Sequence, residues 1–270
     1  MRSITRAPII LALAAILLAS LVPAASAAVA LPTADAVSQA ERSALTLTNR
    51  RRTDRGLAAL QWDTRLAELA RARATFMAKT GTFSHEQNGD NVFDMMSDAG
   101  ITWFGAGEII AWNTAADLAH STAFAVQGWM ESAPHKAILL STGYNYVAFG
   151  LAVSPTTGKR YWAGVYLKGP DRTSAWIKAG TVAKSVVDAG HVKVTITWAG
   201  SDTHLQVLTS GFRDFQLQRR RVGSDWFTFS PTTSKTYSRV WDRNGAYEFR
   251  VRARDKAGLW SPWTTYEINT

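Results

Sequence analysis

The first half of the chain carries apolar residues at intervals of three and four, which is the spacing of one face of an α-helix. This spacing is clearest at residues 64–80, where Asp63 or Thr64 can cap the start of the helix and Gly81 can end it. The residues that share a face of this segment include Leu66, Ala70, Arg73 and Met77. The same spacing predicts helices at residues 36–52, 91–99, 115–130 and 134–140.

The periodicity changes after residue 141. Residues 146–153 and 160–167 are rich in the β-branched and aromatic residues that favour strands. Pro155 and Gly158 lie in the short segment between them, so the two strands are predicted to form a hairpin. Several helices followed by a hairpin predict an α+β domain.

The second half shows strand signals alone. Gly169 and Pro170 precede a polar run, so residues 171–185 are predicted to be a linker. From residue 186 onward, polar and apolar positions alternate, most clearly at 191–199, 214–221 and 246–253. Short alternating strands at this spacing predict an all-β sandwich over residues 186–270. Trp198 continues an apolar strand face, so we expect it in the core.

The first 27 residues have the composition of a secretory signal peptide. Arg2 and Arg6 precede an apolar run over residues 9–22, and Ala25-Ser26-Ala27 supplies the small residues of a cleavage site. The run is short for a membrane span, and no later segment could form one. We expect a secreted, extracellular protein that is cleaved near Ala27, with residues 28–36 as a linker; an uncleaved N-terminal anchor is the alternative.

Charge and cysteine content narrow the set of partners and chemistries. The chain contains no cysteine, which excludes disulfides, thiolate metal sites and a cysteine nucleophile. Its formal net charge is +9, and Arg219-Arg220-Arg221 is the densest basic cluster. A basic exported protein can adhere to an anionic cell wall or membrane surface. A solvated strand end is the simpler explanation of the cluster, and no motif for nucleic-acid binding is present.

Candidate chemistry is limited to a few histidines and carboxylates. The chain has five histidines, namely His85, His120, His135, His191 and His204. Glu108 lies between glycines and apolar residues in GAGEIIAW. None of the HExxH, GxSxG, GxGxxG or phosphate-loop motifs occurs.

The stretch WMESAPHKAILL places Glu131 four residues before His135, which on an unbroken helix would put both on one face. Pro134 lies between them and is predicted to start a new short helix, with Ser132 as its cap. The spacing therefore does not by itself bring Glu131 and His135 together.

Four blocks, taken in order, resemble the CAP superfamily: TFSHEQNG, GEIIA, WMESAPHKAILL and NYVAFGLAVSPTTGKRYWAGVYL. That superfamily takes in cysteine-rich secretory proteins, antigen 5 and pathogenesis-related 1 proteins, and the likeness is to its bacterial, cysteine-free branch. The resemblance covers about residues 37–168. It implies an α–β–α sandwich domain at residues 37–170.

The resemblance also implies a cleft that gathers two histidines with acidic residues. The histidine of the family's FSH block corresponds to His85, and the glutamate of its GENIA block corresponds to Glu108. The histidine of its WxxSxxH block corresponds to His135. Longer members carry a second carboxylate where this chain has Ser132, so Glu131, which is one residue out of register, is the candidate for a fourth member. Such a donor set suits Zn²⁺ or another divalent cation. There are two alternatives to metal binding. A histidine beside a carboxylate could act as a general base, or His85 and His135 could make purely structural hydrogen bonds to Glu108.

The β half resembles a fibronectin type III domain in the blocks VKVTITWAGSD, FQLQRRRVGSDW and AYEFRVRARDKAGLWSPW. Such modules imply a spacer or an adhesion platform. The many tryptophans of this half could instead form a platform for carbohydrate binding, which is the less favoured interpretation. They are Trp198, Trp226, Trp241, Trp260 and Trp263.

The sequence as a whole predicts a secreted binding protein without enzymatic activity. Its cleft would hold a divalent metal through His85, Glu108 and His135, and a small apolar or cell-wall ligand. A metal-dependent hydrolase or protease that uses the same cleft is one alternative, and a cell-surface adhesion protein that acts through the basic β domain is the other.

Overall fold

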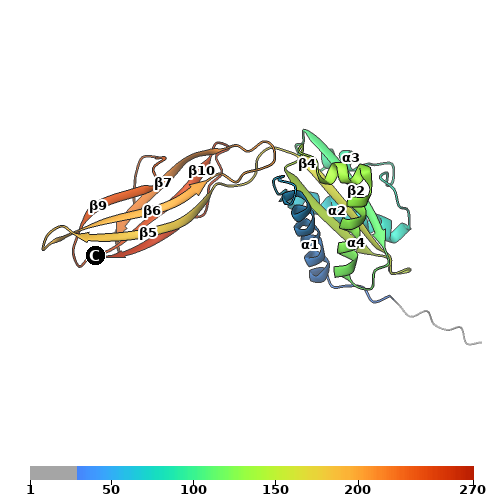
Figure 1. Cartoon of the computed structure of the whole chain (residues 1–270), viewed down its shortest axis with the longest axis horizontal. Coiled ribbons are helices and arrows are strands. Elements are labelled where there is room, and N and C mark those ends of the chain that lie inside the picture. The colour runs from blue at the N-terminus through green and yellow to red at the C-terminus, as the bar shows by residue number, and fades with distance from the viewer. Residues whose placement is uncertain (1–28) are drawn as a thin grey trace, which may run out of the picture.

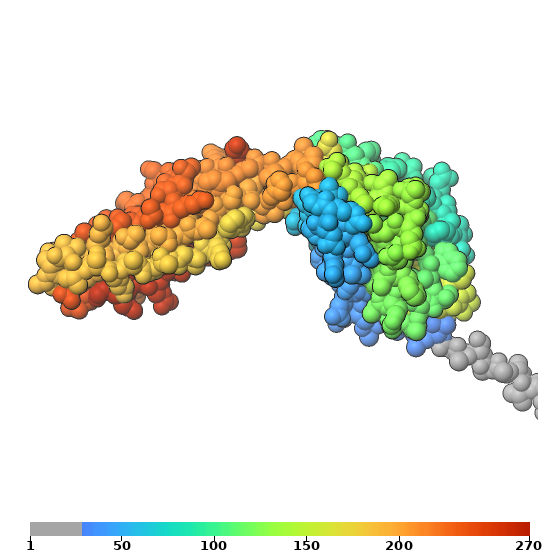
Figure 2. All heavy atoms as spheres, in the orientation of Figure 1, coloured from blue at the N-terminus to red at the C-terminus, as the bar shows by residue number. Residues whose placement is uncertain are grey.

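The computed structural model describes residues 29–270, and these residues form two units that meet at one end (Figure 1, Figure 2). The expected signal peptide at residues 1–27 lies outside the described residues. Within residues 29–270, every helix is too short or too polar to cross a bilayer.

The helices of the first unit follow the predicted hydrophobic periodicity. They are α1 (Ala34–Thr53), α2 (Thr64–Thr80), α3 (Val92–Asp98), α4 (Leu118–Glu131) and α5 (Ala133–Leu139). The prediction for α2 is confirmed at both ends: the Asp63 side chain accepts the Arg65 N–H as the N-cap, and Gly81 ends the helix in the left-handed conformation.

Four strands form the sheet of this unit: β1 (Gln61–Trp62), β2 (Gly105–Asn113), β3 (Tyr146–Val153) and β4 (Arg160–Lys168). Their order is β1-β3-β4-β2, with β1 and β3 parallel and the other pairs antiparallel. The predicted β3–β4 hairpin is confirmed. Strand β2 was not predicted, because both of its faces are covered in the middle and the alternation that marks a strand is missing.

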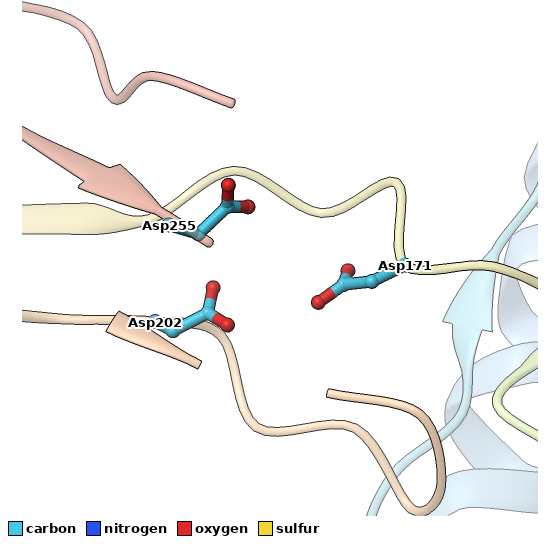
Figure 3. Close-up of side chains that lie close together, drawn as sticks. All are labelled: Asp171, Asp202 and Asp255. Carbon is cyan, nitrogen blue, oxygen red and sulfur yellow. The ribbon is translucent and has the colours of Figure 1, made fainter. Parts of the chain in front are cut away.

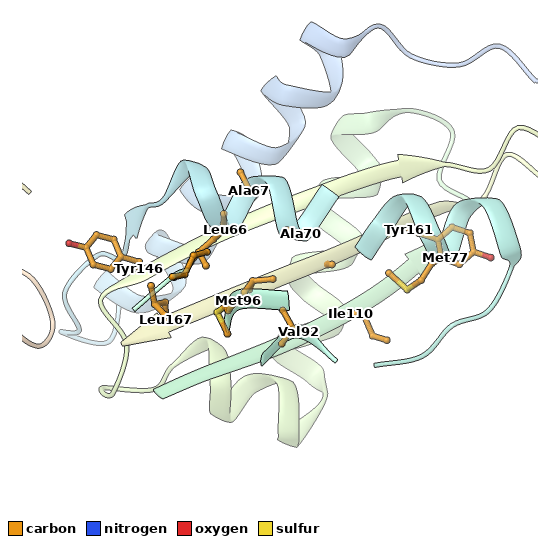
Figure 4. Close-up of a cluster of buried hydrophobic side chains, with 14 of the residues drawn as sticks. Leu66, Ala67, Ala70, Met77, Val92, Met96, Ile110, Tyr146, Tyr161 and Leu167 are labelled. Atoms are coloured by element: carbon orange, nitrogen blue, oxygen red, sulfur yellow. The ribbon is translucent and has the colours of Figure 1, made fainter. Parts of the chain in front are cut away.

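Helices cover both faces of this sheet. On one face, α2 and α3 bury a cluster that includes Leu66, Met77 and Met96 (Figure 4). On the other face, α1, α4 and α5 bury a cluster around Trp129, Phe149 and Trp162. The first unit is therefore a three-layer α–β–α structure, as the family resemblance implied.

The second unit consists of strands alone. They are β5 (Trp176–Val186), β6 (His191–Ser201), β7 (Phe212–Arg221), β8 (Phe227–Thr228), β9 (Thr236–Asp242), β10 (Ala246–Asp255) and β11 (Thr264–Asn269). They form one sheet of order β11-β10-β7-β8 and another of order β5-β6-β9. The two sheets enclose a core that contains Trp198, Phe215 and Phe249. The expected position of Trp198 is confirmed, and the likeness to fibronectin type III stays a prediction.

The linker prediction for residues 171–185 was wrong from residue 176 onward. Residues 176–186 form β5, which pairs antiparallel with β6 and contains a bulge between Ala179 and Val182. This strand lies at a sheet edge, and almost all of it is exposed. An exposed edge strand held by backbone hydrogen bonds needs no alternating apolar pattern, so no strand signal is visible in the sequence there.

The loop after β6 contacts the first unit. Leu205 is buried in the core cluster on the α2 side of that unit. The Gln206 side chain oxygen accepts hydrogen bonds from the Ala58 N–H at 2.8 Å and from Arg52 Nη2 at 3.3 Å. Arg52 is itself fully buried at the end of α1. One loop of the second unit is therefore packed into the first.

Candidate functional site

Glu108 lies in β2, which is an edge strand of the first sheet. Side chains two residues apart on a strand share a face, so Glu108 lies on the same face as Ile110, which packs with the α2 cluster. Only 8% of Glu108 is exposed. A buried carboxylate on this face needs a partner from the helix that covers it.

Arg73 of α2 is that partner. Its Nε donates to Glu108 Oε1 at 2.8 Å and its Nη2 donates to Oε2 at 3.1 Å. Arg73 is fully buried, and its guanidinium also donates to the backbone carbonyls of Asp90 and His85. The result is a bidentate, buried ion pair. The same guanidinium also holds the loop after α2 in place.

The sequence reasoning did not assign a role to Arg73. The available signal was an arginine on the otherwise apolar face of the predicted helix at 64–80. A buried arginine requires a carboxylate opposite it, but nothing in the local sequence identified Glu108 as that carboxylate.

His85 lies in the loop between α2 and α3, and its ring reaches back to the sheet. Its Nδ1 lies 2.7 Å from Glu108 Oε2, and its side chain is 55% exposed. Among the described residues, its Nε2 makes no hydrogen bond. His85 is thus oriented by Glu108 and presents its other nitrogen outward.

His135 lies in α5 and is half-buried. Burial lowers the pKa of His135, and the nearby His85 lowers it further through charge repulsion. The lowered pKa keeps the imidazole neutral at pH 7, which is the form that can bind a metal. The structure thus places His135 within electrostatic range of His85. In the part of the chain that is described, however, His85, Glu108 and His135 do not form a group of ligand atoms within 4.8 Å of one another.

Glu131 does not join this group through any hydrogen bond or ion pair within residues 29–270. It is exposed at the end of α4, and its carboxylate accepts a hydrogen bond from Gln127 at 2.7 Å. Pro134 lies in the first turn of α5, as predicted. Ser132 occupies the cap position with an extended backbone, but its side chain makes no capping hydrogen bond, so that part of the prediction was wrong.

A small cleft of about 250 Å³ opens beside the His85–Glu108 pair. Its lining includes Asn91, Phe93, Ile138 and Tyr144. Tyr144 donates to the carbonyl of Ala106 at 3.1 Å, and a Cβ on Gly107 would approach the Tyr144 hydroxyl to 2.9 Å. The glycine before Glu108 therefore lets Tyr144 pack closely against the strand.

A larger groove, which the sequence reasoning missed, lies between α1 and α4. Its volume is about 970 Å³, and its lining is mostly apolar, including Leu31, Ala40, Leu47, Leu118 and Val153. No motif marks it, because it forms where two helix faces and the segment before α1 leave a gap.

The remaining histidines have local roles. His120 and His191 bond through Nδ1 to Asp117 and Asp188, each three residues earlier, and His204 is exposed. These three histidines lie outside the His85 cleft lining, and so does His135.

The tryptophans and arginines of the second unit contact one another. Trp226, Trp260 and Trp263 are covered by the guanidinium groups of Arg220, Arg250, Arg252 and Arg254. Trp241 is buried in the core. Aromatic faces that carry stacked arginines are not free to stack on sugar rings, which speaks against the carbohydrate interpretation.

Two of the three arginines at residues 219–221 also contact neighbouring side chains. Arg220 pairs with Glu248, and Arg219 lies over Phe227 and Phe229. Only Arg221 of the three is exposed. The simpler explanation of the cluster as part of a strand surface therefore fits the structure.

Comparison with known proteins found relatives by sequence, solved structures of similar fold and one matching family. Two curated Bacillus subtilis proteins are similar to this chain. "Uncharacterized membrane protein YlbC" is 33% identical over 112 residues, which are 41% of this chain and 31% of that protein. "Uncharacterized protein YkwD" is 30% identical over 129 residues, which are 47% of this chain and 48% of that protein. The chain spans about a third and about half of the length of these two relatives.

Solved structures resemble about half of the chain. An outer surface protein from Borrelia burgdorferi aligns with 16% identity and a TM-score of 0.46, covering 52% of this chain and 98% of that one. An extracellular protein containing a SCP domain from Bacillus anthracis aligns with 23% identity and a TM-score of 0.41, covering 52% of this chain and 45% of that one. Residues 45–166 also match the family CAP, described as the cysteine-rich secretory protein family. The matched residues lie within the first unit, which is thus similar to that family over somewhat less than half of the chain.

Proposed function

We propose that the chain is a secreted, non-enzymatic binding protein whose CAP domain holds a divalent cation, Zn²⁺ or a similar ion, through His85 and His135. The signal-peptide pattern at residues 1–27 supports export. The contact between His85 and Glu108 carries the metal part of the proposal, because a carboxylate behind a histidine orients the ring and raises its basicity toward a metal.

The geometry supports a different role for Glu108 from the one implied by the resemblance. Both of its oxygens already accept hydrogen bonds from Arg73, and the positive charge of Arg73 would repel a cation bound directly to the carboxylate. We therefore assign Glu108 to positioning His85, and the metal contacts to His85, His135 and water. When bound, the cation would supply a positive centre for an anionic or carbonyl-bearing ligand.

The same contacts weaken the case for Glu108 as the general base of a hydrolase. A general base needs a free lone pair within reach of a water molecule, but the Glu108 carboxylate is buried against a guanidinium. No serine, threonine or cysteine nucleophile is recognisable in the cleft lining within residues 29–270.

Zinc titration of the full secreted chain tests the proposal. Isothermal titration calorimetry should show one Zn²⁺ bound per wild-type chain and none in the His85→Ala/His135→Ala double variant. Glu108→Gln should weaken binding about 10- to 100-fold, because it removes the partner that orients His85. Glu131→Gln is the matched control and should bind like the wild type. Equal stoichiometry in the wild type and the double variant would remove the metal from the proposal.

The larger groove favours a second binding role, for a small apolar ligand. The sequence led us to expect such a ligand in the histidine cleft, but the apolar space of suitable size lies between α1 and α4. The groove volume of about 970 Å³ is at the upper end of the range for small-molecule sites, about 300–1,000 Å³.

A fluorescent fatty acid is expected to bind the wild-type chain in this groove. Ser43→Trp should abolish the binding, since residue 43 is an exposed helix position that lines the groove and an indole there would fill it. Arg50→Trp adds the same side chain to an exposed position of α1 that is not in the lining, and should leave binding unchanged. Binding that survives Ser43→Trp would place the apolar ligand elsewhere.

A further inference from the structure

Three aspartates from distant parts of the chain converge at the end of the second unit that faces the CAP domain (Figure 3). Asp171 lies in the connecting segment after β4, Asp202 follows β6 and Asp255 ends β10. Each offers one carboxylate oxygen, and these oxygens lie within 4.8 Å of one another. Figure 3 shows the three carboxylates facing a common space.

No lysine, arginine or histidine of residues 29–270 forms an ion pair with any of the three. Asp202 is 8% exposed and Asp255 is fully buried. Negative charges this close together repel one another strongly when they are buried and have no cation between them. The three carboxylates thus form an uncompensated negative centre at the junction.

Asp255 provides an independent sign of a missing partner. Its Oδ1 accepts the Leu259 N–H at 2.7 Å, but its Oδ2 is buried without a hydrogen-bond partner. A buried carboxylate oxygen left without a donor costs free energy, so native structures rarely contain one without a bound ion or water. The other two carboxylates are already held in place by donors from the Ser210–Gly211 turn and from Thr173 and Thr203.

We propose that Asp171, Asp202 and Asp255 bind one calcium ion at the junction of the two units. An all-oxygen donor set favours a hard cation over zinc, which prefers nitrogen and sulfur. Two oxygens on opposite sides of a calcium ion lie about 4.6–5.2 Å apart, since Ca–O distances are about 2.3–2.6 Å. The spacing of the three carboxylates fits that geometry, with water completing the coordination shell.

An ion at this site would have a structural role, because the site lies where the two units meet. Arg172, next to Asp171, pairs with Asp63 of the CAP domain, and its N–H donates to the Tyr146 hydroxyl at 2.7 Å. Asp202 begins the loop whose Leu205 and Gln206 contact the CAP domain. A calcium ion that joins Asp171 to Asp202 and Asp255 would therefore hold the connecting segment and the docking loop together, and so fix one unit against the other.

Calcium titration of the full secreted chain, prepared free of metal with a chelator, tests this inference. We expect calorimetry to show one Ca²⁺ per wild-type chain and a rise in thermal midpoint with added calcium. Asp255→Asn should weaken binding by at least about tenfold, because ligand charge sets calcium affinity. Asp225→Asn removes an exposed carboxylate outside the cluster and should bind like the wild type. The His85→Ala/His135→Ala variant should also keep its calcium, which separates this site from the proposed zinc site.

The stability of the protein in the absence of calcium shows whether the three aspartates bind an ion or serve only the fold. In chelator, Asp255→Asn should be at least as stable as the wild type, since it relieves repulsion, and the order should reverse in calcium. Should Asp255→Asn fail to fold, Asp171→Asn provides the same comparison at a less buried position. Absence of calcium uptake by the wild type, or equal uptake by the wild type and the aspartate variants, would overturn the proposal.

Discussion

Replacing Arg73 with methionine is expected to lower the free energy of unfolding by about 3–5 kcal/mol, the range observed when one partner of a buried ion pair is removed. The arginine is fully buried and the Glu108 side chain is 4% exposed, so the substitution leaves a carboxylate buried without its counter-charge. The carbonyls of His85 and Asp90 also lose their donor. Urea denaturation followed by circular dichroism measures the change.

Two further variants show whether the ion pair is the cause. Arg73→Met/Glu108→Leu removes both charges and should recover much of the lost stability, because a buried pair replaced by apolar residues is often neutral. Arg65→Met removes a half-exposed arginine from the same helix and should cost less than about 1 kcal/mol. A loss below about 1 kcal/mol for Arg73→Met would contradict the buried pair.

Replacing Gly150 with alanine is expected to destabilise the first unit by about 3 kcal/mol or more, at the upper end of the cost of overpacking a core. An added Cβ would lie 2.1 Å from the backbone carbon of Ala70 and 2.3 Å from the backbone nitrogen of Arg71. Those atoms belong to α2, whose opposite ends are fixed by Asp63 and Gly81, so relief requires moving the whole helix away from β3. Thermal unfolding monitored by circular dichroism measures the loss.

Gly128→Ala is the matched control for this effect. Gly128 lies inside α4, where an added Cβ meets nothing within 4 Å. Alanine is favoured over glycine inside a helix by about 1 kcal/mol, so this variant should be slightly more stable than the wild type. If Gly150→Ala were as stable as Gly128→Ala, α2 could not pack as closely on β3 as the structure shows.

The helices and the central hairpin could be predicted because each has one covered face. In α2, the spacing of Leu66, Ala70 and Met77, with Asp63 before it and Gly81 after it, determines the helix and both of its ends. Strand β2 has two covered faces and β5 has almost none, so neither shows the alternation from which strands are recognised.

The candidate sites also depend on contacts between residues that are far apart in the sequence. His85, Glu108 and His135 could be selected only from the order of sequence blocks, because no short motif joins them. Arg73 lies 35 residues from Glu108, and pairing them requires knowing that α2 covers the face of β2 that carries Glu108. Asp202 and Asp255 come together through the arrangement of strands in the second unit, and Asp171 joins them from the connecting segment, so no local pattern in the sequence marks the three as a group.

The most direct test of the proposed function is a crystal of the protein soaked in zinc, with diffraction data collected on both sides of the zinc absorption edge. The proposed binding role predicts one strong anomalous peak between the outward nitrogen of His85 and the His135 ring, with Glu108 still bonded to Arg73 and not to the metal. An ordered structure with both histidines in place and no anomalous peak near them, at a zinc concentration well above the protein concentration, would contradict it.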